Sequence, residues 1–273
     1  MDPIAQALLS AARVESHGMR LYRLGPDGVY AVEENGNFRF LHSDPWETRP
    51  GGWEFGRSID APPSLLPPIR PGKIIGIGRN YRAHAEELGN EVPQEPLIFL
   101  KAQSSVVGHR APILMPSMSE RVDYEGEIAV IVGRRLVHAS EDEARAAIFG
   151  ITAANDVTAR DLQRKDKTFA RGKSFDSFCP LGPCVQTAPD WNALEVHTRV
   201  NGEQQQHGHV EQMLWSPVEL LVYVSRHMTL NPRDVLLTGT PEGVGPLAEG
   251  DTVEVEVTGV GILENRTEKD RRG

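Results

Sequence analysis

The sequence predicts a strand-dominated α+β protein, and three observations support this fold class. First, 26 Gly and 20 Pro among 273 residues indicate many turns, which are typical of proteins built from short strands. Second, most apolar segments are short, about four to eight residues, which is the usual length of a buried strand. Third, few segments carry helix start signals. We therefore expect several strands and few helices, in one large domain or in a large domain with a small companion.

Residues 1–70 are predicted to form a small β-rich N-terminal domain followed by a linker. Residues 1–18 are mildly amphipathic and fit either a short helix or a leader. Short alternating apolar segments after this stretch predict strands with Gly and Asn turns. The density of Pro and Gly in residues 43–72 indicates the linker. The N-terminal strands are expected at residues 19–24 and 29–32.

Residues 71–273 are predicted to form the larger domain. A helix over residues 81–88 is expected to end at Gly89, the residue type that tolerates a left-handed cap. Capping boxes that begin at Ser140 and Ser216 predict helices to Phe149 and to about Met228. The expected strands are 73–78, 97–101, 124–132, 151–156, 196–200, 235–240 and 252–257.

The bulk composition excludes some partners. A formal net charge of −9 and a pI near 5.5 argue against nucleic acid, because no excess of Lys and Arg can neutralise phosphates. No apolar run is long enough to span a bilayer, and the start lacks a signal-peptide pattern. We expect a cytoplasmic protein without a membrane partner, in which Cys179 and Cys184 are reduced.

The strongest chemical signal is a pair of carboxylates next to an apolar segment. On a strand, Glu125 and Glu127 would face the same side. Buried together they repel each other unless a cation neutralises them; the alternative is a solvated edge strand with acidic gatekeepers. Asp156 ends another apolar segment and could reach the same place. Three carboxylates without His or Cys suit Mg²⁺ or Mn²⁺, with Ca²⁺ also possible.

A candidate base lies on the first helix of the larger domain. His84 and Glu87 are three residues apart, so they share a helix face and can hydrogen-bond. A carboxylate that orients an imidazole makes a competent general base, although an incidental surface His would show the same spacing. A dinucleotide fingerprint at Gly76-Ile77-Gly78 is rejected because the third Gly is missing.

Two further segments could contact an anion. Lys173 lies between Gly and Ser and could deliver an ammonium to a substrate oxygen. The charged run before it, residues 160–167, is interpreted as a solvated helix or loop. The Gly-rich loop over residues 237–245 could wrap a small anion through its amides and the Thr240 hydroxyl. It lacks the Lys of a nucleotide-binding loop, so ATP is not favoured.

These segments together resemble the fumarylacetoacetate hydrolase family. The resemblance runs from about Lys73 to Arg266 and implies a mixed β-sandwich roll of the C-terminal type of that family, usually a homodimer. The stretch over residues 204–210 departs from the usual pattern, which concerns substrate detail. The matching segments are Gly78–Tyr81 with His84 and Glu87, Asp123–Glu127, Asn155–Asp161, Gly172–Asp176, Val200–Glu203 and Leu237–Pro241.

The resemblance also implies roles for individual residues. It implies that Glu125, Glu127 and Asp156 bind Mg²⁺ or Mn²⁺, and that His84 and Glu87 form the base on a lid. Lys173 is expected to be catalytic. Substrate contacts are expected from Arg79, Tyr81, Gln163 and Thr240.

We expect a hydrolase that cleaves a carbon–carbon bond in a β-diketo acid, such as an acylpyruvate. The same chemistry serves isomerases and decarboxylases of aromatic catabolism, so a 2-hydroxyhepta-2,4-diene-1,7-dioate isomerase or a 2-oxo acid decarboxylase is the alternative. A non-catalytic oxo-acid binding protein is a third hypothesis. It is less favoured because ionisable groups clustered at a metal usually indicate catalysis.

Overall fold

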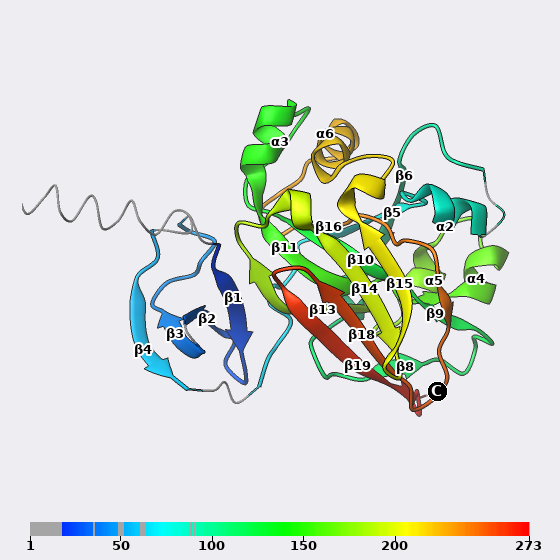
Figure 1. Ribbon diagram of the computed structural model, residues 1–273, viewed down its shortest axis with the longest axis horizontal. Helices are drawn as coiled ribbons and strands as arrows, with labels where there is room; N and C mark the ends of the chain where they lie inside the picture. Colours follow the sequence, from blue (N-terminus) through cyan, green and yellow to red (C-terminus); the bar gives the residue numbers. More distant parts are fainter. Residues whose placement is uncertain are drawn as a thin grey trace, which may run out of the picture.

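The computed structural model describes residues 18–34, 36–48, 52–60, 64–87, 89 and 91–272. Among these residues, eleven strands form a large mixed sheet, five form a second sheet and three form a small third one. Figure 1 shows the second sheet in front of the larger one, with helices at the upper and right-hand sides. The predicted strand-dominated α+β class is confirmed. The interpretation of residues 1–17 lies outside the described residues.

The elements have the following bounds. The helices are α2 (Arg82–Glu87), α3 (Glu141–Ala147), α4 (Arg160–Lys165), α5 (Ala170–Lys173) and α6 (Pro217–His227). The strands are β1 (Arg20–Leu24), β2 (Val29–Glu34), β3 (Asn37–Leu41), β4 (Phe55–Ile59), β5 (Ile74–Gly78), β6 (Leu97–Lys101), β7 (Val106–Val107), β8 (Ile113–Met115), β9 (Val122–Tyr124), β10 (Gly126–Val132), β11 (Ile148–Asn155), β12 (Thr158–Ala159), β13 (Cys179–Gln186), β14 (Glu195–Val200), β15 (Glu203–His209), β16 (Val235–Leu237), β17 (Gly245–Pro246), β18 (Thr252–Val257) and β19 (Gly261–Lys269).

The N-terminal strands continue the large sheet. Its strand order is β4-β3-β2-β1-β13-β11-β10-β16-β5-β6, with β7 beside β13. β1 pairs antiparallel with β13, where Leu21 lies opposite Val185. The predicted linker was wrong where it covered β4, because Phe55 pairs with Leu41 of β3 and stacks under the Arg39 guanidinium. The boundary near residue 70 stays a prediction.

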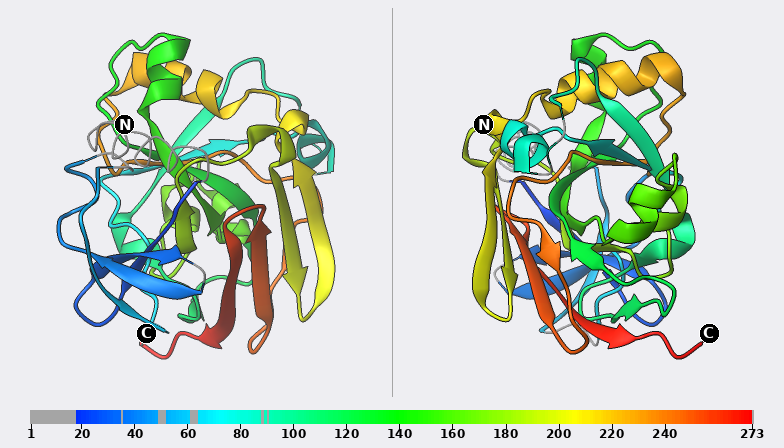
Figure 2. Two further views of the ribbon diagram at one scale, coloured as in Figure 1. Left: turned by 60° about the vertical axis from the view of Figure 1, so that its left-hand side comes forward. Right: turned by 90° about the vertical axis from the view of Figure 1, so that its right-hand side faces the viewer.

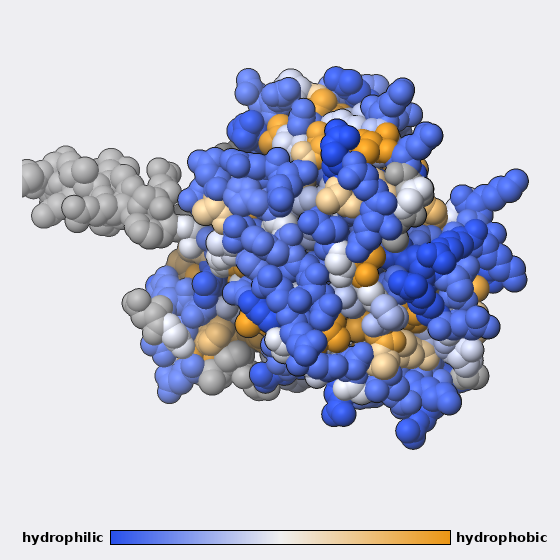
Figure 3. Space-filling model, turned by 45° about the vertical axis from the view of Figure 1, so that its right-hand side comes forward, coloured by the Kyte–Doolittle hydropathy of each residue, from blue (hydrophilic) through white to orange (hydrophobic). Residues whose placement is uncertain are grey.

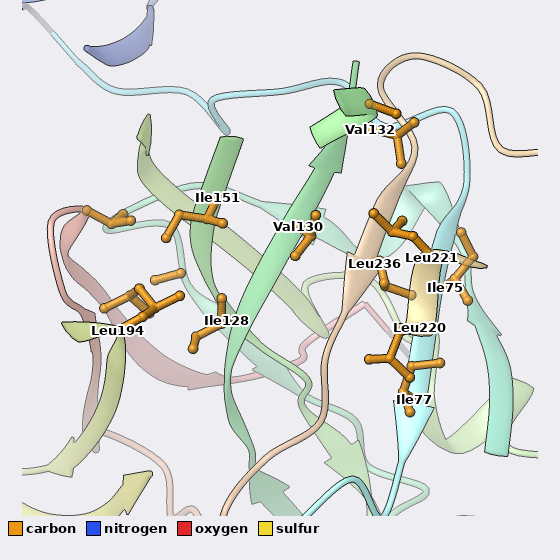
Figure 4. Close-up of a cluster of buried hydrophobic side chains, with 14 of the residues drawn as sticks. Ile75, Ile77, Ile128, Val130, Val132, Ile151, Leu194, Leu220, Leu221 and Leu236 are labelled. Atoms are coloured by element: carbon orange, nitrogen blue, oxygen red, sulfur yellow. The ribbon is translucent and has the colours of Figure 1, made fainter. Parts of the chain in front are cut away.

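Strand β10 is buried on both faces and joins two cores. Ile128, Val130 and Val132 belong to a core shared with β18, α3 and α6 (Figure 4). Ala129 and Ile131 point the other way, into a core shared with β1, β13 and β16. Because successive residues of a strand face opposite sides, a strand covered on both faces is apolar throughout. The run from Ile128 to Val132 has this composition.

Helix boundaries follow the capping signals closely. The Ser140 side chain accepts a hydrogen bond from the Glu143 amide, and the Glu143 carboxylate accepts one from the Ser140 amide, as predicted. Ser216 caps α6 in the same way. α3 ends at Ala147, however, so the expectation of a helix to Phe149 was wrong: Phe149 lies in β11. None of the helices in the described part of the chain is long and apolar enough to cross a membrane.

Several strands were not predicted. β13 carries Pro180, Gly182 and Pro183, which conceal a strand pattern, and β15 is mostly polar because it lies at a sheet edge with an exposed face. Cys179 and Cys184 lie in β13 as free, buried thiols, in agreement with the sequence prediction. Figure 2 shows the two sheets from the side, and Figure 3 shows a largely hydrophilic outer face.

The two-sided burial of β10 predicts a large cost for truncating it. Ile131→Ala should lower the free energy of unfolding by about 2–5 kcal/mol, because a fully buried side chain is lost and a cavity remains. Ile262→Ala on β19 is the matched control; Ile262 is 40% exposed and should cost under about 0.5 kcal/mol. Urea unfolding measures both. Equal costs would contradict this description of the core.

Candidate metal centre

A break between β9 and β10 places the first candidate ligand. Residues 124–132 were predicted as one strand, but Glu125 lies at the break. Its amide donates to the Asn155 side chain (2.9 Å), and its carbonyl accepts from the Asp156 amide (2.8 Å). The next residue, Gly126, must lack a side chain, because a Cβ there would lie 2.0 Å from Thr198 Oγ1. β14 therefore packs directly against the backbone at Gly126, between the two glutamates.

The three candidate metal ligands come together in the structure. Glu125, Glu127 and Asp156 each offer one carboxylate oxygen, and these oxygens lie within 4.8 Å of one another. All three residues are at most 4% exposed. The alternative of a solvated edge strand does not fit this burial. Three buried carboxylates that meet in one place offer only oxygen ligands. Such a set of ligands suits a hard divalent cation.

Three buried cationic side chains compensate part of this negative charge. Lys173 Nζ donates to Glu125 (2.6 Å) and to Asp156 (2.5 Å). The Arg160 guanidinium donates to Glu125 Oε1 (2.6 Å) and to Asp123 (2.9 Å). Lys101 Nζ forms a buried ion pair with Asp156. Each of these side chains is at most 4% exposed.

Sequence reasoning missed two of these cations. Arg160 was interpreted as part of a solvated charged run, which is wrong for this residue because its guanidinium is enclosed by carboxylates. Lys101 was not considered at all. The sequence did contain a signal for its burial: Lys101 is the one charged residue of β6 and ends an otherwise apolar strand. In the structure it is the buried residue of that strand. A charge placed there requires a partner.

The two glutamates respond differently to burial. Burial by itself would raise the pKa of Glu125, but Lys173 and Arg160 hold that pKa well below its ordinary value. Burial, followed by the charges of Asp156 and Glu125, raises the pKa of Glu127 well above its ordinary value. No Lys or Arg of the described residues forms an ion pair with Glu127, whose carboxylate accepts from the Gly239 amide (2.6 Å). A divalent cation would supply the missing charge, so the residues fit one.

A cavity of about 320 Å³ opens onto the carboxylates. Its volume lies at the lower end of small-molecule sites. Of the predicted substrate residues, Arg79, Gln163 and Thr240 line it, as do His84 and Lys173. Tyr81 and Glu87 are not among the described residues that line it. The other lining side chains include Ile77, Leu97, Phe99, Phe169, Arg160, Arg164 and Asp166.

The predicted hydrogen bond between His84 and Glu87 is absent. His84 Nδ1 lies 3.7 Å from Glu87 Oε2, beyond hydrogen-bond distance, and has no hydrogen-bond partner among the described residues. The Glu87 carboxylate instead accepts from the Gly243 amide (3.1 Å). Burial lowers the pKa of His84, and Arg160 and Lys173 act in the same direction, against the charges of Glu125 and Glu87. A lowered pKa favours the neutral imidazole, the form that can accept a proton.

A further buried side chain braces the centre. Gln206 of β15 accepts from the Gly126 amide (3.0 Å) and donates to Thr240 Oγ1 and to the Pro241 carbonyl, both at 2.8 Å. Thr240 in turn donates to the Gly126 carbonyl (2.9 Å). Gln206 thus ties the peptide between the glutamates to the Gly-rich loop. It was not predicted, because a Gln within a polar stretch carries no signal of burial.

Comparisons with known proteins identify the chain's relatives. Residues 73–268 match the family described as fumarylacetoacetate (FAA) hydrolase C-terminal. The human mitochondrial oxaloacetate tautomerase is 41% identical over 214 residues, which cover 74% of this chain and 68% of that protein. The two sequences are thus similar over the larger part of both chains.

Two solved structures are similar over nearly the whole chain. A 5-carboxymethyl-2-hydroxymuconate delta-isomerase from Mycobacterium smegmatis is 40% identical, with a TM-score of 0.82, and covers 92% of this chain and 100% of that one. A fumarylacetoacetate hydrolase from Exiguobacterium antarcticum is 36% identical, with a TM-score of 0.82, and covers 92% and 99%. The relatives thus include an isomerase, a tautomerase and a hydrolase.

Replacing Glu127 tests whether the centre binds a divalent cation. Folding raises the pKa of Glu127, so the metal-free protein loses stability as the pH rises above the unfolded-state value of about 4.3. At pH 7, Glu127→Gln should therefore raise metal-free stability by roughly 1 kcal/mol or more. Added Mg²⁺ should raise the Tm of the wild type and leave that of the variant unchanged. Thermal unfolding with EDTA or Mg²⁺ measures both effects; equal gains with Mg²⁺ would refute the assignment.

Proposed function

The chain belongs to the fumarylacetoacetate hydrolase family, and from this premise we propose that it is a divalent-metal-dependent hydrolase of β-diketo acids. Its substrate would be an acylpyruvate or a fumarylacetoacetate-like acid, cleaved at a carbon–carbon bond. The observation that carries the proposal is one cavity lined by a buried imidazole and a buried carboxylate cluster. Members of this family typically use a divalent metal. Homodimer formation stays a prediction.

The role proposed for the cation and its ligands is to stabilise negative charge on the substrate. Glu125, Glu127 and Asp156 would hold Mg²⁺ or Mn²⁺, which when bound supplies Lewis-acid stabilisation for negative charge on a 2-oxo acid. Lys173 Nζ donates to the carboxylates of Glu125 and Asp156, at 2.6 and 2.5 Å, so its ammonium compensates these two residues without the cation. Its Nζ also lies 4.8 Å from the centre of the Phe99 ring. This wall of the cavity holds a positive charge beside the substrate position.

The base of the reaction is His84. Its side chain lines the cavity and takes a proton from water, and the remaining hydroxide adds to the distal carbonyl carbon of the substrate. The carbon–carbon bond then breaks, and its electron pair leaves with the pyruvate carbon. That carbon takes back one proton, and two carboxylic acids are released. Arg79 and Arg164 line the same cavity and provide positive charge for substrate carboxylates.

Proton transfer between carbons is the second candidate function. It is favoured by the relatives named as an isomerase and a tautomerase, which are 40% and 41% identical to this chain. In that reaction His84 takes a proton from a carbon acid, and no water is added. Decarboxylation of a 2-oxo acid would draw on the same residues.

An assay of products separates these functions. Purified protein with Mg²⁺ or Mn²⁺ is incubated with a panel of acylpyruvates, unsaturated oxo-diacids and oxaloacetate. A hydrolase releases pyruvate and a second acid from an acylpyruvate. An isomerase or tautomerase changes the ultraviolet absorbance without releasing acid, and a decarboxylase releases CO₂. Absence of acid release across the acylpyruvates would overturn the leading proposal.

Removing the imidazole should separate chemistry from metal binding. His84→Ala should lower kcat by roughly 100-fold or more, because general-base catalysis contributes about this much. Mg²⁺ affinity should be unchanged, because His84 is not a ligand in the proposed set. Steady-state kinetics and calorimetric titration with Mg²⁺ measure the two effects. Unchanged turnover would exclude His84 as the base.

The pH dependence of the reaction reports the buried imidazole. Only the neutral form of His84 can accept a proton, so kcat/KM should rise with pH through its pKa and level off above it. Burial lowers that pKa, which places the midpoint below the ordinary value of about 6.5. A pH–rate profile of the metal-loaded enzyme gives the midpoint. A value above the ordinary one would contradict the assignment.

A further inference from the structure

A second group of ligand-type side chains lies on the outer face of the five-stranded sheet. Antiparallel pairing of β14 with β15 sets His197 opposite His207. Glu195 precedes His197 by two residues on the same strand and therefore shares its face. One ligand atom from each of these three residues lies within 4.8 Å of the other two. We call these residues the sheet-face cluster; the two strands that carry it are labelled in Figure 1.

Two imidazole rings share one carboxylate in this cluster. Their centroids lie 4.4 Å apart and their planes differ by 7°, so the rings stack. His197 Nε2 lies 3.3 Å from Glu195 Oε2, and His207 Nε2 lies 3.5 Å from Glu195 Oε1. Both ring nitrogens and both carboxylate oxygens thus border one small volume. Side-chain exposures of 38%, 23% and 49% for Glu195, His197 and His207 make this volume accessible to solvent.

We propose that Glu195, His197 and His207 bind one divalent transition-metal ion, of the kind represented by Zn²⁺. Two imidazole nitrogens and a carboxylate oxygen are ligands that Zn²⁺, Ni²⁺ and Cu²⁺ favour, whereas Mg²⁺ and Ca²⁺ favour oxygen alone. Strand pairing holds the three ligands close before the ion binds. Water completes the coordination from the exposed side. This site is separate from the carboxylate centre, with which it shares no residue.

Neighbouring groups are compatible with a bound cation. Arg199, the cationic residue of β14, donates to Glu256 of β18 at 2.8 Å, so its charge is compensated. His209, on the same strand as His207, is already used: its Nδ1 accepts from the Glu211 amide at 3.1 Å. The ligand set therefore has three side chains.

His207 lies in the mostly polar stretch of β15. In the same stretch Gln206 points inward and braces Gly126, whereas His207 points outward. Alternation along β15 therefore gives one residue to the carboxylate centre and the next to the sheet-face cluster.

Electron paramagnetic resonance with Cu²⁺ tests the proposal. The full chain is saturated with Mg²⁺, which occupies the carboxylate centre, and then receives one equivalent of Cu²⁺. We expect one bound Cu²⁺ per chain, with hyperfine coupling to imidazole nitrogens. His207→Gln and Glu195→Gln should each weaken Cu²⁺ and Zn²⁺ binding roughly tenfold or more, and His207→Gln should also remove the coupling of one ring.

A matched control guards against binding by scattered surface histidines. His227→Gln removes an exposed imidazole from the end of α6 and should leave Cu²⁺ binding unchanged. Circular dichroism of the metal-free variants checks that each one folds, and the two cluster variants keep the test decisive if one of them does not. Copper binding and nitrogen coupling that survive both cluster substitutions would overturn the proposal, as would the absence of any nitrogen-coupled copper in the wild type.

Discussion

Mutual repulsion among buried carboxylates governs the structure around the cavity. Glu125, Glu127 and Asp156 are held together where β10 begins and β11 ends, away from water. Such a group is stable only if cations surround it. Lys101, Arg160 and Lys173 supply three of them, from β6, α4 and α5. The ends of five separate elements are therefore positioned by one electrostatic requirement.

The compensation is incomplete at one residue, and that residue connects structure to chemistry. Glu127 receives a backbone amide but no ion pair from the described residues, and its pKa is raised by burial and its neighbours. The same burial and the same cations lower the pKa of His84. A divalent cation would lower the pKa of Glu127 again and would lower the pKa of His84 further. The same buried environment thus favours both metal binding and a neutral imidazole.

Much of the fold and of the carboxylate cluster could be predicted from the sequence, because their signals are local. Apolar runs located β5, β10, β11 and β18, and the capping boxes located α3 and α6. What depends on distant contacts could not be predicted. Proline hid β13, and the burial of Lys101, Arg160 and Gln206 follows from neighbours far away in the chain. The spacing of His84 and Glu87 predicted that they share a helix face. It could not show that the Glu87 carboxylate accepts a hydrogen bond from the Gly243 amide and makes none with His84.

Anomalous X-ray diffraction from crystals grown with Mn²⁺ tests most directly whether the three carboxylates hold one divalent cation. We expect one manganese peak per chain, at about 2.1 Å from oxygens of Glu125, Glu127 and Asp156. Lys173 should be drawn away from at least one of these carboxylates. A cluster without manganese, in which Lys173 still bridges Glu125 and Asp156, would contradict this expectation.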